Sequence, residues 1–278
     1  MTSNDNLDIT AALGIKIRKE AQENLEVKVS ERTAELLAKN EELELRNHEL
    51  QQFAWVVSHN LKEPLRKIEI FTSLIKDRFA DADDQTQSYI DRTIHAANRM
   101  SKLISDLLEY SRLSQEFEPE AVDLNDIVGE VMADLDFQIE QKSAKLVLSD
   151  LPVINGVPSQ MRQVFHNLIG NSLKFAQENQ PPVIEVKAER VATKTVKSKI
   201  SPDGKFWRIT VRDNGIGFDE TYIEKIFIIF QSLHARETYD GTDIGLAIAK
   251  KIIEKHNGMI TARSKPGHGA TFIILLPL

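Results

Sequence analysis

The stretch Ser58-His59-Asn60-Leu61-Lys62-Glu63-Pro64-Leu65-Arg66 sets a histidine inside a helical pattern, five residues before a proline. A seven-residue repeat runs through it, with Val29, Leu36, Leu43, Leu50 and Val57 at position d and Thr33, Asn40, Asn47, Ala54, Leu61, Ile68 and Ile75 at position a. In this frame His59 falls at position f, away from the seam, where solvent and a second domain can reach its ring. An outward imidazole can accept a phosphoryl group.

The repeat predicts a coiled coil that continues into the histidine region as one helix. Asn40 and Asn47 fall at position a, where an asparagine favours a parallel, in-register dimer. The alternative is a lone amphipathic helix with a solvated polar face. We expect Pro64 to bend or loosen this helix, because proline lacks an N–H and clashes with the preceding turn.

A second helix follows a turn at residues 79–85 and repeats its apolar residues in two stripes, namely Ile90, Ala97 and Ile104, and Thr93, Met100 and Leu107. The two helices form a hairpin. One hairpin alone leaves apolar surface in water, so two hairpins from a dimer are expected to close a four-helix bundle.

After Leu113 the sequence no longer follows a heptad repeat, and helical patterns alternate with strand patterns. We expect helices at 124–141, 158–176 and 244–255, and strands at 145–148, 183–187, 206–211, 259–262 and 271–275. Helices mixed with strands of a single sheet predict a two-layer α/β sandwich. The fold class is thus α plus α/β: a parallel coiled coil, a dimeric hairpin, and the sandwich.

Composition narrows the classes of function. The 278 residues suffice for about two domains, and zero cysteines exclude a disulfide framework, thiolate metal sites and a cysteine nucleophile. A net charge of −7 argues against broad nucleic-acid binding. No apolar stretch approaches the roughly 20 residues of a membrane span, and no signal peptide is evident, so we expect a cytoplasmic protein or the cytoplasmic part of a longer one.

Three polar residues share one face of the helix that Pro158 begins: Asn167, Asn171 and Lys174. Their oxygens suit Mg²⁺, which usually arrives with nucleotide phosphates, and the ammonium suits a phosphate. A solvated polar face is the plainer interpretation. Further on, Asp213-Asn-Gly215-Ile-Gly217-Phe218 closes an apolar strand, and its glycines let the backbone turn close to a ligand. Alone, this pattern is often just a turn.

In this order, the histidine stretch, the asparagine helix, the Asp213 turn and Gly241-Thr-Asp-Ile-Gly245-Leu246 resemble the sensor histidine kinases of two-component signalling, from about Leu50 to the C-terminus. The resemblance implies a Bergerat-type ATP-binding sandwich with ATP and Mg²⁺ as cofactors. It implies His59 and Asn60 as the catalytic residues: His59 accepts the phosphoryl group, and Asn60 can orient its ring but cannot accept its proton. Asn171 is implied as the metal ligand. The implied nucleotide-binding residues are Asn167, Asn171, Lys174, Asp213, Gly215, Gly217, Phe230, Gly241, Gly245 and Leu246.

The same resemblance predicts the organisation and the partners. The signalling helix would occupy 1–50, the phosphotransfer hairpin 51–113, a linker 114–122 and the ATP-binding domain 123–278. The partners would be a second copy of the chain and the receiver domain of a response regulator. Leu7-Asp8-Ile9-Thr10 resembles the end of a PAS sensor domain, in which case a sensor domain would precede the chain; an ordinary frayed terminus is the alternative. For His48, His95 and His256 we expect surface positions on helices.

Three residues depart from the family pattern. Asn60 replaces the usual acidic residue, Ser232 stands where arginine is frequent, and Asp243 replaces a glycine. Together they keep open a degenerate kinase that serves as a scaffold or as a phosphatase toward the regulator. A Bergerat ATPase of the chaperone or topoisomerase kind is a third interpretation, which the coiled coil and His59 disfavour.

Overall fold

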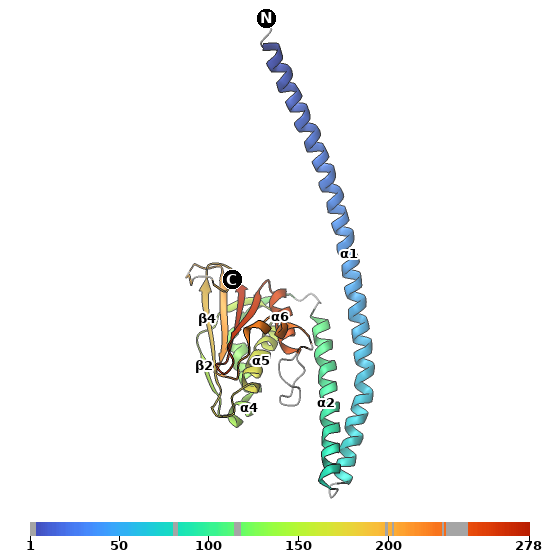
Figure 1. Ribbon diagram of the computed structural model, residues 1–278, viewed down its shortest axis with the longest axis vertical. Helices are drawn as coiled ribbons and strands as arrows, with labels where there is room; N and C mark the ends of the chain where they lie inside the picture. The colour runs from blue at the N-terminus through green and yellow to red at the C-terminus, as the bar shows by residue number, and fades with distance from the viewer. Residues whose placement is uncertain are drawn as a thin grey trace. The chain divides into compact units, whose positions relative to one another are not determined.

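The structure, a computed structural model, describes residues 4–79, 83–113, 118–197, 200–201, 203–229, 231 and 244–278. For part of the first helix, His59 included, it describes the backbone alone. The chain divides into two compact units, Met1–Val56 and Val57–Leu278. The second unit contains a helical hairpin and an α/β domain (Figure 1).

Helix α1 runs unbroken from Asn4 to Arg78, as the continuous heptad frame predicted. Pro64 lies inside it and does not end it. In the first unit, the described seam residues Val29 and Leu36 are 56% and 67% exposed. A single copy of the helix therefore leaves these apolar side chains in water.

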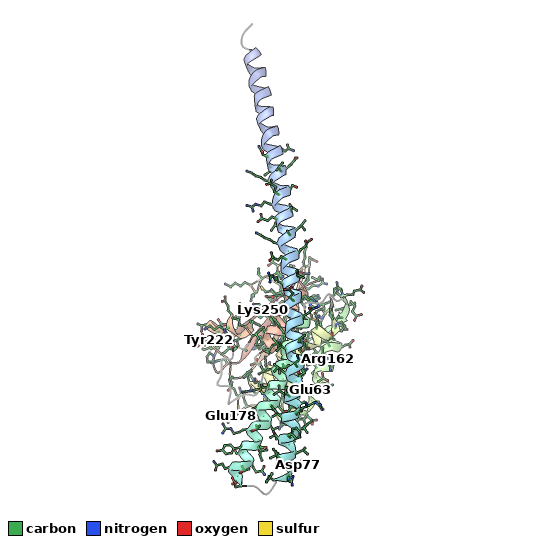
Figure 2. All side chains as sticks on the ribbon, turned by 90° about the vertical axis from the view of Figure 1, so that its right-hand side faces the viewer. Glu63, Asp77, Arg162, Glu178, Tyr222 and Lys250 are labelled. Carbon is green, nitrogen blue, oxygen red and sulfur yellow. The ribbon has the colours of Figure 1, made fainter. Side chains whose placement is uncertain are left out.

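The hairpin is formed by the end of α1 and by α2 (Asp84–Arg112). Asp83 begins α2 by accepting a hydrogen bond from the Thr86 backbone N–H at 2.9 Å, a side-chain cap of the usual kind. Apolar residues buried along the hairpin are Leu65, Ile90, Ala97 and Ile104. Figure 2 labels Glu63 and Asp77 on α1, the latter in its last turn.

A second apolar stripe of the hairpin stays exposed. Its members occupy seam positions of the predicted frame and are 44–47% exposed on α1, namely Leu61, Ile68 and Ile75, while Met100 on α2 is 49% exposed. A hairpin with one buried and one exposed stripe has the surface that a second hairpin would cover.

The α/β domain contains a mixed sheet of five strands in the order β2-β4-β5-β7-β6. Its strands are β2 (Lys145–Leu148), β4 (Val183–Val191), β5 (Phe206–Asp213), β6 (Met259–Ser264) and β7 (Ala270–Pro277). β2 pairs with β4 in parallel, and the other neighbours are antiparallel. The register places Arg212 opposite Thr271, so the end of β5 lies beside the start of β7.

Helices cover one face of this sheet (Figure 1): α3 (Leu124–Asp134), α4 (Asp136–Gln141), α5 (Pro158–Lys174) and α6 (Gly245–Lys255). α5 begins with proline, which suits the first helical turn. Side chains with no exposed surface, such as Leu168 and Ile252, fill the space between helices and sheet. Arg162 of α5 (Figure 2) also reaches Asp134 of α3 at 2.5 Å. The predicted two-layer sandwich is confirmed.

The prediction of a single sheet was wrong. β1 (Glu120–Asp123) and β3 (Val153–Gly156) form a second, two-stranded antiparallel sheet. Neither stretch has the run of apolar residues that marked β2 at 145–148, and their pairing joins segments that are distant in the sequence. The helix expected at 124–141 is also divided at Leu135 into α3 and α4. Short 3₁₀ turns lie at Glu220–Tyr222 and Lys225–Phe227.

Within the part of the chain that the structure describes, no helix is long and apolar enough to cross a membrane.

Candidate nucleotide site

Asp213, the last residue of β5, is buried with 8% of its surface exposed. Its Oδ1 accepts two backbone hydrogen bonds, from Gly215 at 2.9 Å and from Ala270 at 3.0 Å. Its Oδ2 lies 3.4 Å from the Ser172 hydroxyl. Burial raises the pKa of Asp213, while these hydrogen bonds oppose the rise. One carboxylate oxygen is therefore held in place, and the other keeps capacity to accept a hydrogen bond.

The turn after Asp213 requires glycines. A Cβ on Gly215 would overlap the carbonyl oxygen of Phe175, and Gly217 has φ +62° with the Lys265 carbonyl against it. The Ile216 N–H donates to the same Phe175 carbonyl at 2.9 Å. Close backbone packing at the end of α5 thus explains this part of the predicted glycine motif.

The polar face of α5 lies beside the start of α6. Asn167 Nδ2 donates to the Gly245 carbonyl at 3.0 Å, and a Cβ on Gly245 would lie 3.0 Å from Asn167 Oδ1. Asn171 and Lys174 follow on the same helix and are partly buried, with Lys174 Nζ 4.6 Å from the centre of the Phe175 ring. Leu246 is the second residue of α6. The Asn167 amide nitrogen is therefore engaged in joining the two helices.

The structure brings most of the predicted residues into one domain but does not describe all of them. Phe230 and Gly241 lie outside the described residues, as do the departures Ser232 and Asp243. Of His59 the backbone is described, and it is helical; Asn60 is exposed. Phe227 is buried in the core, which agrees with a packing role.

Among the described residues, no group of three or more histidine, cysteine, aspartate or glutamate side chains could hold a metal ion. The candidate oxygen donors are the side-chain amides on α5. This set fits Mg²⁺ that arrives with phosphate oxygens and retains water ligands, rather than a cage made of protein alone.

Several contacts of Asp213 were not found from the sequence. Ser172 belongs to the opposite side of α5 from the polar face, and Ala270 is 57 residues beyond Asp213. Neither has a sequence pattern that marks it. Only the register of β5 against β7 brings Ala270 to the carboxylate.

His256 is half-buried at the C-cap of α6, so the expectation of a surface position on a helix was only partly right. Its Nε2 accepts from the Val157 N–H at 3.1 Å, and its Nδ1 lies 2.8 Å from the Ile252 carbonyl. This arrangement requires the neutral ring with the proton on Nδ1. Burial lowers the pKa of His256, and the neighbouring Lys255 lowers it further, against the Ile252 hydrogen bond, which raises it. The ring joins the start of α5 to the end of α6.

Replacing His256 by alanine is expected to lower the free energy of unfolding by about 1–3 kcal/mol at pH 8, because the Val157 N–H loses its acceptor. The cost should shrink at pH 5, since the unfolded chain takes up a proton below its ordinary pKa of 6.5 while the folded ring resists it. Urea unfolding at both pH values measures this. His95→Ala, on an exposed face of α2, is the matched control. A cost that is the same at both pH values would contradict the neutral-ring assignment.

Comparison with known proteins agrees with this architecture. Residues 156–278 match the family described as Histidine kinase-, DNA gyrase B-, and HSP90-like ATPase, and residues 49–116 match the His Kinase A (phospho-acceptor) domain. A crystal structure of full-length ShkA in complex with AMPPNP shares the fold, with a TM-score of 0.59 at 22% identity over 81% of this chain and 45% of that one.

Two similar relatives are a phytochrome-like protein and a cyanobacterial phytochrome. The Phytochrome-like protein Cph1 of Synechocystis sp. is 36% identical over 277 residues, which are 98% of this chain and 34% of that protein. Cyanobacterial phytochrome A of Nostoc sp. is 34% identical over 98% of this chain and 33% of that protein. The chain thus spans about a third of the length of these relatives. A phosphoacceptor domain followed by an ATPase domain, together with this similarity along almost the whole chain, shows that the chain belongs to the sensor histidine kinases.

Proposed function

We propose that this chain phosphorylates its own His59 from Mg-ATP and passes the phosphoryl group to an aspartate of a response regulator. The observation that carries the proposal is the geometry of Asp213, whose Oδ1 is held by two backbone N–H groups. Incubation of the purified protein with labelled Mg-ATP tests it, because phosphohistidine is labile in acid and stable in base.

Adenine recognition is assigned to Asp213 Oδ2. An exocyclic amine needs an acceptor, and a carboxylate oxygen whose partner oxygen is already engaged offers one in a fixed direction. The buried surroundings strengthen such a bond, because water competes for it less. Gly215 and Gly217 would let the ring approach the backbone of this turn.

The phosphates are assigned to the neighbouring helices. The start of α6, at Gly245 and Leu246, carries backbone N–H groups without partners in the helix, which favour anions. Lys174 would provide a positive charge, and Asn171 would bind Mg²⁺. When bound, Mg²⁺ would neutralise phosphate charge. Asn167 would hold the start of α6 through the Gly245 carbonyl.

The transfer itself needs little covalent chemistry from the protein. A ring nitrogen of His59 attacks the γ-phosphorus, and the new N–P bond forms as the bond to the bridging oxygen breaks and ADP leaves. The proton of the resulting imidazolium passes to solvent, because the Asn60 amide cannot accept it. In the second step the carboxylate of the regulator attacks the phosphorus and the N–P bond breaks.

The chain is further proposed to act as a dimer through the coiled coil and the hairpin. The support is the exposed apolar stripe of the hairpin, because seam residues 44–47% exposed in one copy would be buried against a second.

Ile68→Lys is expected to raise the dimer dissociation constant about 100-fold or more, because burying unpaired ammonium groups costs several kcal/mol. Light scattering after size exclusion, at several protein concentrations, measures this. Ile70→Lys is the matched control: the two isoleucines are 46% and 45% exposed, but Ile70 lies at position c, away from the seam. Equal effects of the two substitutions would argue against this seam.

A degenerate kinase that acts as a scaffold or phosphatase is the second candidate. Its support is Asn60, which is exposed beside His59 and cannot act as a base, together with Ser232 and Asp243. This candidate expects nucleotide binding without phosphohistidine.

A further inference from the structure

The segment after α5 packs against the turn that follows Asp213. Gln177 Nε2 lies within hydrogen-bonding distance of three backbone carbonyls: Asn214 at 2.9 Å, Gly215 at 3.0 Å and Gly267 at 3.2 Å. The side-chain amide has two N–H groups, so the three carbonyls share them. Gln177 is partly buried, and the sequence around it carries no motif that predicts this contact.

These carbonyls belong to two separate segments. Asn214 and Gly215 follow β5, whereas Gly267 lies in the turn between β6 and β7. The N–H groups that hold Asp213 Oδ1 come from Gly215, in the first segment, and from Ala270, the first residue of β7, which directly follows the second. Gln177 therefore joins the two segments on which the orientation of the carboxylate depends.

Backbone contacts reinforce this connection. The Gly267 N–H donates to the Ile216 carbonyl at 2.6 Å, and Ile216 donates to Phe175, two residues before Gln177. Gln180 provides a comparison within the same segment: its Nε2 also reaches the Asn214 carbonyl, at 3.2 Å, but it is exposed and bonds neither Gly215 nor Gly267. Among the described side chains of this segment, Gln177 alone bridges both turns.

We propose that Gln177 is a positioning residue for nucleotide recognition: its amide fixes the two turns so that Asp213 Oδ2 faces the exocyclic amine of adenine. The inference rests on the proposed function, since it assumes that Asp213 accepts from that amine. Removing the Gln177 donors leaves the carboxylate in place but lets the turns that direct it move.

The test compares two nucleotides and two variants. Mg-ATP and the Mg complex of purine riboside triphosphate, which lacks the exocyclic amine, are titrated calorimetrically into the full chain. Gln177→Leu removes the donors at similar size, and Gln180→Leu is the matched control.

A misdirected Asp213 would lose its hydrogen bond to the adenine amine, and such a bond corresponds to roughly a tenfold change in affinity. Gln177→Leu is therefore expected to raise the Kd for ATP about tenfold. The Kd for the amine-free analogue should change less than about threefold. Gln180→Leu should leave both within about twofold.

Gln177→Glu is the second variant, because it keeps the length of the side chain but directs an acceptor at three carbonyls. It should weaken ATP binding at least as much as Gln177→Leu. Equal losses for both nucleotides would overturn the inference, since they indicate general loosening of the domain. A Kd for ATP that neither Gln177 variant changes would also overturn it while leaving the proposed role of Asp213 intact. An unmodified chain that binds both nucleotides equally would instead refute adenine recognition by Asp213, and the inference with it.

Discussion

Replacing His59 by alanine is expected to abolish incorporation of acid-labile, base-stable phosphate from Mg-ATP, a loss of at least about 1,000-fold. The proposed reaction has one nucleophile, and alanine offers no lone pair to attack the γ-phosphorus. Nucleotide affinity should stay within about twofold, because His59 belongs to the hairpin and the proposed nucleotide contacts belong to the α/β domain.

His95→Ala is the control for this experiment, because it removes an exposed histidine from the other helix of the same hairpin. It should retain full labelling. Label that persists without His59 would refute the assigned phosphoacceptor. Absence of label in the unmodified chain, with ATP still bound, would favour the degenerate kinase, because the Asn60 amide beside His59 cannot act as a base.

Asp213→Asn is expected to raise the Kd for ATP by roughly 30- to 1,000-fold, equivalent to about 2–4 kcal/mol. The amide oxygen can still accept from the Gly215 and Ala270 N–H groups, so the turn should keep its shape. The amide nitrogen then occupies the place of Oδ2 and directs N–H groups at the adenine amine. Two donors face each other, and a site built around that amine loses its acceptor.

Calorimetric titration with Mg-ATP measures this loss, and thermal unfolding followed by circular dichroism shows whether the domain stays folded. Asp219→Asn is the matched control: Asp219 lies six residues further on, is exposed, and accepts from the Thr221 N–H at 2.9 Å, a bond that an amide oxygen preserves. An ATP affinity unchanged by Asp213→Asn would remove the observation on which the proposed function depends.

Local patterns predicted the helices and most strands well. The heptad repeat predicted α1 as one helix, because it reports which side chains share a face, and Pro158 marked the start of α5. Local patterns failed at β1 and β3, which lack the apolar run that marked the equally short β2. There the pairing of residues 120–123 with 153–156, rather than periodicity, makes the strands.

The candidate site was likewise predicted only in part from the sequence. The order of the motifs resembles that of the sensor histidine kinases, and this resemblance predicts a nucleotide site at Asp213 and α5. It could not show that Asn167 bonds the Gly245 carbonyl, or that His256 bonds Val157 across 99 positions in the chain.

By itself, then, the sequence determined the helical hairpin, the sandwich and the residue types of the site, because periodicity and motif spacing are local properties of the chain. Only the tertiary structure decided that Asp213 Oδ1 is held by Ala270 and that Gln177 joins two turns. The reason is physical: those partners meet through the pairing of β5 with β7 and the packing of α5 against the sheet, and no short stretch of sequence encodes which distant backbone group will lie within 3 Å of a given side chain.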